Sequence, residues 1–294
     1  MSKTRVLLTG ASGFIGRNIR EQLDDKYELL CPSSHDLNLL DSAVVSEYLA
    51  SKQPDLVVHV AGKGVSRGQP LTADIAENNL RMFFNLVRNK KHFQRLIVIG
   101  SGAEYDKSRS ISQVTEADFD RSVPQDQYGF SKYVMSKYAE QVDYITHLRL
   151  FGVYGKYEDY TIRFISNMIA RALNDLPLVI NQNANFDYIF IDDLVRIIDL
   201  MIMAKPVQTF YNLGGDQAVE LLQVAQLVNE QLNKRLPIEI KISGLNKEYT
   251  CSSDRFKQEY PNFKFTDLKV AIQKLTYYYQ NNNETIDPDK LRTN

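Results

Sequence analysis

Residues 5–16 read RVLLTGASGFIG, an apolar strand that runs directly into three glycines and then into a helix-like segment. A phosphate group meets backbone amides and the positive end of a helix only where the loop between strand and helix lacks side chains. We expect Gly10 to allow the tight turn, Gly13 the close approach of a pyrophosphate, and Gly16 the packing of helix on strand. This order predicts a dinucleotide-binding loop, the alternative being a glycine-rich turn without a ligand.

The overall composition argues against several classes of protein. The chain of 294 residues carries 35 basic and 36 acidic side chains, a net charge of -1, so charge does not indicate nucleic acid or an anionic membrane as partner. No stretch approaches the roughly 20 apolar residues that cross a bilayer, and residues 1–5 are too polar for a signal peptide. Cys31 and Cys251 could form one disulfide in principle, but a reducing compartment fits better. We therefore expect a soluble, cytoplasmic protein.

The order of apolar segments predicts an α/β fold. Over the first 150 residues or so, strands alternate with helices, a pattern typical of right-handed crossovers and a Rossmann-type, doubly wound parallel sheet. Ligands of such sheets bind beyond the carboxyl ends of the strands. The expected strands cover residues 27–31, 55–61, 95–100, 145–151, 178–180 and 210–213, and the expected helices cover residues 42–51, 74–90, 127–142, 162–174, 195–203 and 221–232.

This pattern also predicts the domain organisation. We expect an NAD(P)-binding Rossmann domain from residues 1–155 together with residues 187–213, which thread back to it. Residues 156–186 and 214–280 are expected to form a smaller C-terminal α/β substrate lobe. The last segment, residues 281–294, is polar and is expected to fray.

Tyr128 and Lys132 are the best candidates for catalysis. They stand four residues apart in YGFSK and so share one face of a helix. A tyrosine with its ordinary pKa near 10 is a poor acid-base group at neutral pH, and a nearby ammonium lowers that pKa by favouring the phenolate. Ser101 follows the predicted strand of residues 95–100 and is placed to hydrogen-bond a substrate oxygen. Such a tyrosine-lysine pair alone is common on solvated helices, but here it accompanies a glycine loop and a strand-end serine.

Taken together, these motifs resemble the extended short-chain dehydrogenases/reductases, the group of sugar-nucleotide epimerases, dehydratases and reductases. The similarity covers nearly the whole chain. It includes TGASGFIG at the cofactor loop, HVAG after the third strand, residues 79–85, SGAEY at the serine motif and YGFSK. Later landmarks of the same kind are RLFGVYG, FDYIFIDDL and FYNLGG.

The resemblance implies NAD(P) as cofactor and assigns roles to residues. Tyr128 is implied as proton donor or acceptor, Lys132 as a contact of the nicotinamide ribose, and Ser101 as a contact of the reacting hydroxyl or ketone. Asp41, with Leu40 beside it, is implied to bind the adenine amino group. The implied cofactor contacts are Gly10, Ser12, Gly13, Phe14, Ile15, Gly16, Ser33, Leu40, Asp41, Ala61, Gly62, Tyr128 and Lys132, and the implied substrate contacts include Ser101, Gly102 and Tyr128.

Departures from the family pattern narrow the chemistry. Dehydratases carry an Asp-Glu pair directly after the serine position, where this chain has Gly102 and Ala103, so 4,6-dehydration is not expected. GDP-fucose synthases use a cysteine and a histidine for double epimerisation, and the matching positions here hold Ala103 and Tyr157. Hydride transfer at one carbon remains. Gly152 and Lys156 also depart from the family, which usually has asparagine and proline there.

The choice between NADP and NAD depends on the end of the second strand. NAD-binding members place an acidic residue there that binds the ribose hydroxyls and repels a 2′-phosphate. This chain reads CPSS at residues 31–34, so NADP(H) is favoured over NAD(H). No arginine occupies the same segment to clamp the phosphate. Arg17 and His35 are candidates for that contact, with solvated side chains an equally good interpretation.

The remaining polar residues have mostly structural interpretations. His59 is expected to be a packed, hydrogen-bonded core histidine, His92 and His147 are expected to be structural, and no metal-ligand spacing is present. Asp192 and Asp193 read better as a helix cap than as a metal pair. Residues 277–279, three tyrosines, read as packing on a terminal helix. Arg163 and Arg255 are candidates for binding a substrate diphosphate, the alternative being surface salt bridges.

These observations predict an NAD(P)H-dependent reductase of a nucleotide-linked 4-keto-6-deoxy sugar, with Tyr128 as proton donor. A sugar-nucleotide 4-epimerase with tightly bound NAD is the first alternative, and a non-catalytic NAD(P)-binding sensor is a remote one. The resemblance suggests a homodimer built through the helices near Phe83 and Tyr133. The sequence alone does not identify the nucleotide base or the sugar.

Overall fold

The computed structural model describes residues 3–64 and 74–292 and divides into two compact units. Unit 1 comprises Met1–Arg109, Thr115–Leu150 and Leu194–Leu213, and unit 2 comprises Ser110–Val114, Phe151–Asp193 and Gly214–Asn294. Residues 110–114, 151–155 and 187–193 therefore belong to unit 2, whereas the sequence placed them in the Rossmann domain. The reason is strand pairing within unit 2, where β7 (Val153–Tyr154) pairs with β10 (Ile189–Phe190) and β5 (Ile111–Val114) pairs with β14 (Tyr249–Cys251).

Unit 1 is built on one parallel sheet of 6 strands in the order β11-β6-β4-β3-β1-β2. The predicted Rossmann-type α/β fold is therefore confirmed. The strand order reverses between β1 and β3, and this switch point is where open α/β sheets bind their ligands. Every strand of this sheet was predicted, with ends that differ by a residue or two. The strands are β1 (Arg5–Thr9), β2 (Glu28–Leu30), β3 (Leu56–His59), β4 (Arg95–Ile99), β6 (Ile145–Leu150) and β11 (Phe210–Leu213).

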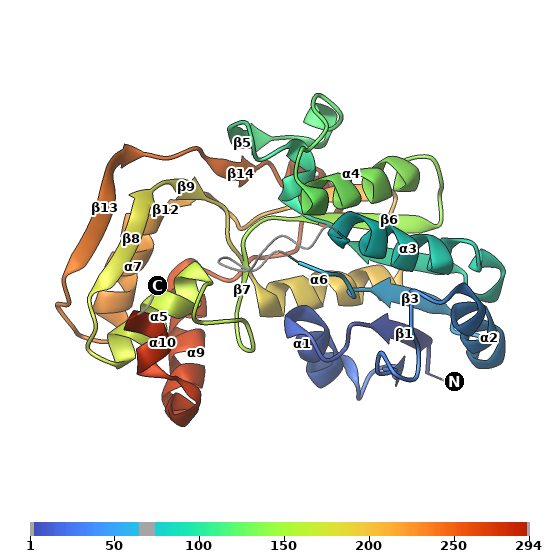
Figure 1. The fold of residues 1–294 in the computed structure, drawn as a ribbon, viewed down its shortest axis with the longest axis horizontal. Helices are drawn as coiled ribbons and strands as arrows, with labels where there is room; N and C mark the ends of the chain where they lie inside the picture. Colours follow the sequence, from blue (N-terminus) through green and yellow to red (C-terminus); the bar gives the residue numbers. More distant parts are fainter. Residues whose placement is uncertain (1–2, 65–73, 293–294) are drawn as a thin grey trace. The chain divides into compact units, whose positions relative to one another are not determined.

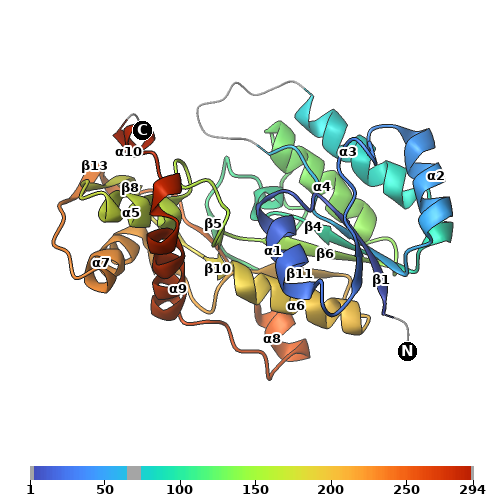
Figure 2. The ribbon, with the colours of Figure 1, turned by 90° about the horizontal axis from the view of Figure 1, so that it is seen from below.

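Helices cover both faces of this sheet (Figures 1 and 2). Helices α1 (Phe14–Leu23) and α6 (Ile191–Met203) lie on one face, and α2 (Ser42–Lys52), α3 (Ile75–Val87) and α4 (Gln127–Ala139) lie on the other. Short 3-10 turns complete the unit: η1 (Lys90–His92), η2 (Gly102–Tyr105) and η3 (Glu116–Asp118). Because both faces are covered, β3 and β6 are buried along their whole length, and such strands read as nearly continuous apolar runs.

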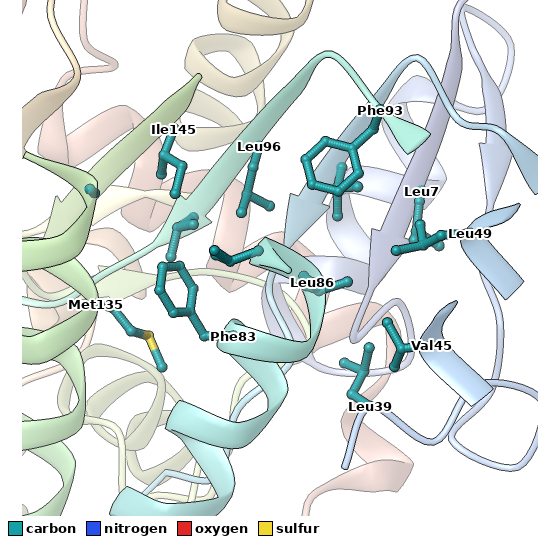
Figure 3. Packing of buried hydrophobic residues seen from close by; sticks show 14 of the residues in the cluster. Leu7, Leu39, Val45, Leu49, Phe83, Leu86, Phe93, Leu96, Met135 and Ile145 are labelled. Carbon is teal, nitrogen blue, oxygen red and sulfur yellow. The ribbon is translucent and has the colours of Figure 1, made fainter. Parts of the chain in front are cut away.

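Apolar side chains of the strands and of α2, α3 and α4 pack into one cluster (Figure 3). Phe83 of α3 lies fully buried at its centre, edge-on to the ring of Tyr138 at 5.8 Å between centroids. The side chain of Phe83 therefore faces the core of the unit, so a dimer contact through this helix would use other side chains of α3. The labelled members of the cluster are Leu7, Leu39, Val45, Leu49, Phe83, Leu86, Phe93, Leu96, Met135 and Ile145.

Unit 2 combines small sheets with a group of helices. Helices α5 (Phe164–Leu173), α7 (Leu221–Gln231) and α9 (Leu268–Asn281) pack on one another, and α5 and α7 also pack on β8 (Leu178–Asn183). The strand β13 (Ile238–Leu245) pairs in parallel with β8. The remaining elements are β9 (Asn185–Phe186), β12 (Val219–Glu220), α8 (Asp254–Glu259), η4 (Asn283–Thr285) and α10 (Pro288–Arg292). None of β9, β12, β13 or β14 was predicted, because short or exposed strands lack a clear apolar alternation.

The chain end and the acidic pair differ from the sequence interpretation. Within residues 281–292 the chain forms η4 and α10 and buries Ile286 and Leu291, so these residues do not form a frayed tail. Asp193 lies in the first turn of α6, and its carboxylate accepts hydrogen bonds from the amide and hydroxyl of Thr266, at 2.7 and 2.6 Å. Asp193 therefore lies inside the first turn of the helix instead of at the position before it. Its charge there agrees with the predicted role as a partner of the helix dipole, whereas its bonds to Thr266, also in unit 2, were not predicted.

Three further observations concern the described residues, 3–64 and 74–292. No group of His, Cys, Asp and Glu side chains among them has the arrangement of a metal site. In the same residues, no helix is long and apolar enough to cross a membrane. Within them, neither Cys31 nor Cys251 forms a disulfide.

Candidate active site

The glycine loop follows β1 as predicted, and its three glycines lack side chains for different reasons. A Cβ at Gly10, which has a φ of +72°, would lie 2.7 Å from the amide nitrogen of Ala61, and a Cβ at Gly16 would lie 2.1 Å from the carbonyl oxygen of Gly10. A Cβ at Gly13 would meet only that same oxygen, at an ordinary 3.5 Å. The fold therefore requires Gly10 and Gly16, whereas the protein's own atoms leave room for a side chain at Gly13.

Gly13 is also the N-cap residue of α1, and no side chain caps the helix there. The first amides of a helix without a side-chain cap attract an anion. Ser12 is exposed, and Phe14 and Ile15 are half-buried at the first turn. The fold itself does not need glycine at position 13, but a phosphate group close to the backbone would need a residue without a side chain there. The loop therefore fits the pyrophosphate of a dinucleotide.

The end of β3 lies against this loop. The hydroxyl of Thr9 and Nδ1 of His59 are 2.8 Å apart, and the amide of Ala61 donates to the same hydroxyl at 3.3 Å. His59 is buried, and burial, with a smaller effect from Lys132, lowers its pKa to about 3. The predicted core histidine is therefore a neutral one. Beyond it, Gly62 lies where a Cβ would be 3.9 Å from the ammonium nitrogen of Lys132.

Ser101 begins the turn η2 directly after β4. Its hydroxyl accepts a hydrogen bond from the amide of Ala103 at 3.2 Å, and its own amide donates to Oε1 of Glu104 at 2.8 Å. These two bonds form a capping box. Gly102 and Ala103 are buried in the turn, and Glu104 is fully buried with its oxygens bonded to other protein groups. Glu104 therefore does not replace the acid that dehydratases carry at the neighbouring positions.

Helix α4 carries Tyr128 and Lys132 to the same end of the sheet. Asp126 caps the helix by accepting the amide of Gly129 at 2.8 Å. A Cβ at Gly129 would lie 2.8 Å from the carbonyl oxygen of Ala103, so the first turn of α4 presses directly on η2. Tyr128 is half-buried, and the ammonium of Lys132 lies 5.9 Å from the centroid of its ring.

The ammonium of Lys132 is buried near the end of β4. It donates to the carbonyl oxygen of Ile99 at 2.7 Å, two residues before Ser101. Burial lowers the pKa of Lys132 to about 8, and the negative charge of Glu104 opposes that shift. Ser101, Tyr128 and Lys132 thus come from two elements, η2 and α4, that pack together at the carboxyl end of β4.

Two neighbours of this group had no site role assigned from the sequence, although Asn79 opens the motif of residues 79–85. Asn79 of α3 is buried, exchanges hydrogen bonds with the backbone of Lys63 at 2.7 and 3.0 Å, and donates to the hydroxyl of Ser131 at 3.2 Å. It therefore joins the segment after β3 to α4. Lys107 is exposed, and its ammonium lies 5.8 Å from the ring centroid of Tyr128. The signal for Asn79 was a polar residue on the apolar face of a predicted helix, and Lys107 had no such signal.

Residues assigned to the adenosine end have structural roles of their own. Oδ1 of Asp41 accepts the amides of Ala43 and Val44, at 2.9 and 3.2 Å, and so caps α2. Leu40 beside it is half-buried. After β2, the hydroxyl of Ser33 donates to Oδ2 of Asp36 at 2.6 Å. The sequence interpretation missed this carboxylate, because it stands three residues beyond Ser33 and only the turn brings it back.

The candidate substrate residues of unit 2 lie on separate helices. Arg163 is exposed at the start of α5, and Arg255 is half-buried on α8. Gly152 has a φ of +47°, and a Cβ there would lie 2.1 Å from the carbonyl oxygen of Asp187. The departure from asparagine at position 152 is thus explained by close backbone approach. Tyr157 packs edge-on against Tyr278 at 5.6 Å between ring centroids.

Comparison with known proteins identifies the family. A model of the NAD dependent epimerase/dehydratase family matches residues 6–214. The chain is 25% identical to a GDP-L-colitose synthase of Yersinia pseudotuberculosis over 94% of its own length and 98% of that protein. It is 24% identical to a UDP-glucose 4-epimerase of Mycoplasma pneumoniae, with 83% and 87% covered. MlghC, a GDP-mannoheptose C4 reductase of Campylobacter jejuni solved with NADP, superposes with a TM-score of 0.81 at 16% identity, with 95% and 99% covered.

The chain therefore belongs to the NAD dependent epimerase/dehydratase family. The predicted membership of the extended short-chain dehydrogenases/reductases is confirmed, and with it the assignment as an NAD(P)-dependent enzyme of sugar-nucleotide chemistry.

Proposed function

We propose that the protein is an NAD(P)H-dependent reductase of a nucleotide-linked 4-keto-6-deoxy sugar. The observation that carries this proposal is the position of Lys132, whose ammonium is bonded to Ile99 and lies 5.9 Å from the ring centroid of Tyr128. That position gathers Ser101, Tyr128 and Lys132 at the carboxyl end of one strand, where ligands of such sheets bind.

Each of the three side chains has a role in the proposed reaction. The nicotinamide, when bound, supplies the hydride that reduces the ketone carbon. Tyr128 gives its phenolic proton to the ketone oxygen as negative charge develops there, and the Ser101 hydroxyl hydrogen-bonds the same oxygen. Lys132 stabilises the phenolate that is left on Tyr128. Its ammonium has three N–H donors and uses one on Ile99, so it can also bind the nicotinamide ribose.

The rest of the site supports reduction at one carbon. Gly102 and Ala103 provide no acid or base, and Glu104 is held in the protein interior. Ala103 and Tyr157 stand where fucose synthases have their epimerising pair. The C4 reductase among the similar proteins agrees with this chemistry by name.

For the cofactor, we favour NADP(H), since β2 ends without the acidic residue that binds ribose hydroxyls in NAD-dependent members. The NADP-bound reductase among the similar structures is consistent with this preference. Asp36, bonded to Ser33, opposes it, because its charge faces the same segment. The other cofactor contacts are proposed as the sequence assigns them. Arg163 and Arg255 are proposed to bind the substrate diphosphate, because a fork of donors suits that charge.

Replacing Tyr128 by phenylalanine tests the mechanism. We expect kcat to fall by about 10² to 10⁴-fold, the usual worth of a positioned acid, while the affinities for NADPH and NADH change little. Turnover is measured as cofactor oxidation in the presence of a panel of keto-sugar nucleotides. Binding of NADPH and NADH is measured by quenching of the protein's fluorescence. If the activity of Tyr128→Phe differs from that of the unchanged enzyme by only a few per cent, Tyr128 is not the acid.

A 4-epimerase is the second candidate, favoured by the similarity to a UDP-glucose 4-epimerase. Such an enzyme needs its nicotinamide only catalytically. Protein that purifies with bound nicotinamide and interconverts 4-epimers without added reductant, while leaving every ketone of the panel unreduced, would overturn the reductase proposal. A non-catalytic sensor is disfavoured by the intact set of Ser101, Tyr128 and Lys132.

We also propose a homodimer and a cytoplasmic location. Phe84 of α3 and Phe130 of α4 are 37% and 38% exposed, and the ring of Phe84 packs on Tyr138 of α4 at 5.5 Å between centroids. This aromatic surface of two neighbouring helices suits a second copy of the chain. Cys31 and Cys251 form no disulfide in the described residues, which suits a reducing compartment.

A further inference from the structure

Glu104 is a carboxylate buried completely beside Ser101. Its side chain is 0% exposed. Oε1 accepts the amide of Ser101 at 2.8 Å and lies 2.8 Å from Nε2 of His147, and Oε2 accepts Nε of Arg149 at 3.1 Å. Hydrogen bonds and positive charge hold the pKa of Glu104 below its ordinary value in spite of burial. The group is therefore a fixed negative charge in the interior of unit 1.

Arg149 extends this contact to the helix that carries Tyr128 and Lys132. Its guanidinium, itself 0% exposed, donates to the hydroxyl of Ser136 on α4 at 2.6 Å and to Oε1 of Glu140, the C-cap residue of α4, at 3.0 Å. It also lies 3.8 Å from the ring centroid of Phe119. One chain of charged contacts thus joins the Ser101 turn, strand β6 and helix α4.

A purely structural purpose does not require charges at these positions. Replacing a buried ion pair by apolar groups of similar volume is often neutral or stabilising, because the charges give up their hydration. The Glu104 network lies at the element junction where the proposed catalytic groups meet. Its position suggests that the negative charge itself is needed there.

The carboxylate of Glu104 and the ammonium of Lys132 bind the same short segment of backbone. Glu104 accepts the amide of Ser101 at 2.8 Å, and Lys132 donates to the carbonyl oxygen of Ile99, two residues earlier, at 2.7 Å. Burial alone favours the neutral amine, and Glu104 opposes this effect. Among the described residues, the other side chains that neighbouring elements present to Lys132 carry no negative charge. The groups on neighbouring elements are His59 of β3, which is neutral, Asn79 of α3, Tyr128 of α4 itself, and His147 and Arg149 of β6, which face Glu104.

We propose that Glu104 is a positioning residue of the active site, which holds the Ser101 turn against β6 and α4 and serves as the counter-charge of Lys132. This inference rests on the proposed function for the roles of Ser101 and Lys132. It assigns no contact with substrate to Glu104, whose oxygens are bonded to the protein.

Glu104→Gln removes the charge and keeps the size of the side chain. Loss of an opposite charge at close range changes a pKa by about one unit or more, so Lys132 should lose its proton about one pH unit lower. The alkaline inflection of kcat should move by the same amount, and kcat above it should fall about tenfold, with KM for the sugar nucleotide nearly unchanged. The shift in the pKa of Lys132 can be measured without turnover by following the NMR signal of its side chain against pH in protein labelled with 13C-lysine. The signal of Lys132 is identified as the one that is missing in Lys132→Met.

Glu140→Gln is the matched control. It removes the other carboxylate that binds Arg149, but Glu140 has no contact with the Ser101 turn among the hydrogen bonds of the described residues. It should lower the melting temperature and leave the Lys132 titration where it is. If Glu104→Gln fails to fold, Glu104→Gln is combined with Arg149→Met, which removes both buried charges. Its titration is compared with that of Arg149→Met alone, so that the difference isolates the charge of Glu104. Glu104→Asp keeps the charge, so its inflection should stay in place.

An unshifted Lys132 titration in Glu104→Gln, or in the double variant when it is compared with Arg149→Met alone, would overturn the proposal. An equal shift in Glu140→Gln would also overturn it, because any loss of Arg149 contacts would then suffice. If the unchanged enzyme reduces no ketone, the proposed reaction fails, yet the labelled-lysine titration still decides whether Glu104 controls the charge of Lys132.

Discussion

At the scale of single residues, Glu158 shows how burial alone sets the charge of a side chain. It lies in unit 2, 7% exposed, and accepts the hydroxyl of Ser166. Burial raises its pKa from 4.5 to about 8, and the bond from Ser166 and the charge of Arg163 reduce that shift only in part. The folded protein therefore holds Glu158 mostly protonated at neutral pH, whereas the unfolded chain ionises it.

This difference predicts a loss of stability with rising pH. Because the folded pKa is the higher one, the stabilisation is complete below pH 4.5 and is lost as pH rises towards 8. Glutamine does not ionise, so Glu158→Gln should not lose this stability as pH rises. Its melting temperature should therefore exceed that of the unchanged protein most clearly near pH 8. The gain there is on the order of a few kcal/mol. Thermal unfolding from pH 5 to 9 measures it.

Glu239→Gln is the control for this prediction, since it neutralises an exposed carboxyl of the same unit. Its unfolding curves should follow the unchanged protein at every pH. Parallel pH dependences for Glu158→Gln and the unchanged protein would show that Glu158 is ionised in the folded state.

At the scale of elements, the segment from β1 through the glycine loop to α1 contains glycines with different purposes, some needed for folding and one suited to ligand binding. Gly16 is required by the chain itself, since a Cβ there would lie 2.1 Å from a backbone oxygen. Gly13 has an extended backbone with a φ of -79°, and a Cβ there makes only an ordinary contact. The same loop therefore contains one glycine for packing and one whose bare backbone serves a ligand.

Two alanine variants test this division. Gly13→Ala should keep the melting temperature within a degree or two and weaken binding of NADPH and NADH by about tenfold or more, because the methyl group occupies the approach of the pyrophosphate. Gly16→Ala should unfold at a clearly lower temperature, with a loss of about 1–3 kcal/mol from overpacking. Calorimetry and fluorescence titration measure both. If folded Gly13→Ala binds the cofactor as tightly as the unchanged protein, the loop is not the site that binds the pyrophosphate.

At the scale of the whole molecule, the proposed dimer depends on exposed aromatic side chains of α3 and α4. The side chain of Phe84 is 37% exposed, while Phe83 beside it is buried in the core. An exposed aromatic patch of this kind on a soluble enzyme commonly marks a protein interface. The interface should therefore depend on Phe84 and not on Phe83.

Phe84→Glu should convert a dimer into a monomer, because a carboxylate is unfavourable in an apolar contact. Sedimentation velocity at several protein concentrations measures the change. Tyr277→Glu is the matched control: it places the same charge on α9, where the replaced ring is 67% exposed, and should leave the sedimentation coefficient unaltered. A dimer that survives Phe84→Glu would place the interface elsewhere.

The sequence by itself determined the features that repeat at short range. The spacing of Gly10, Gly13 and Gly16, the four-residue step from Tyr128 to Lys132, and the alternation of strands and helices in unit 1 are set by local geometry. Each was visible because neighbouring residues in the chain are neighbours on one helix face or in one turn.

Only the tertiary structure decided which distant groups share a charge or a hydrogen bond. Glu104 meets Arg149 from another strand, and Asp36 turns back onto Ser33. Exposed strands such as β13 depend on pairing with β8 for their existence. No local pattern encodes these contacts, because burial and partner choice depend on how segments far apart in the chain pack. The positions of Ser101, Tyr128 and Lys132 were therefore predictable from sequence, whereas the charges that surround them were not.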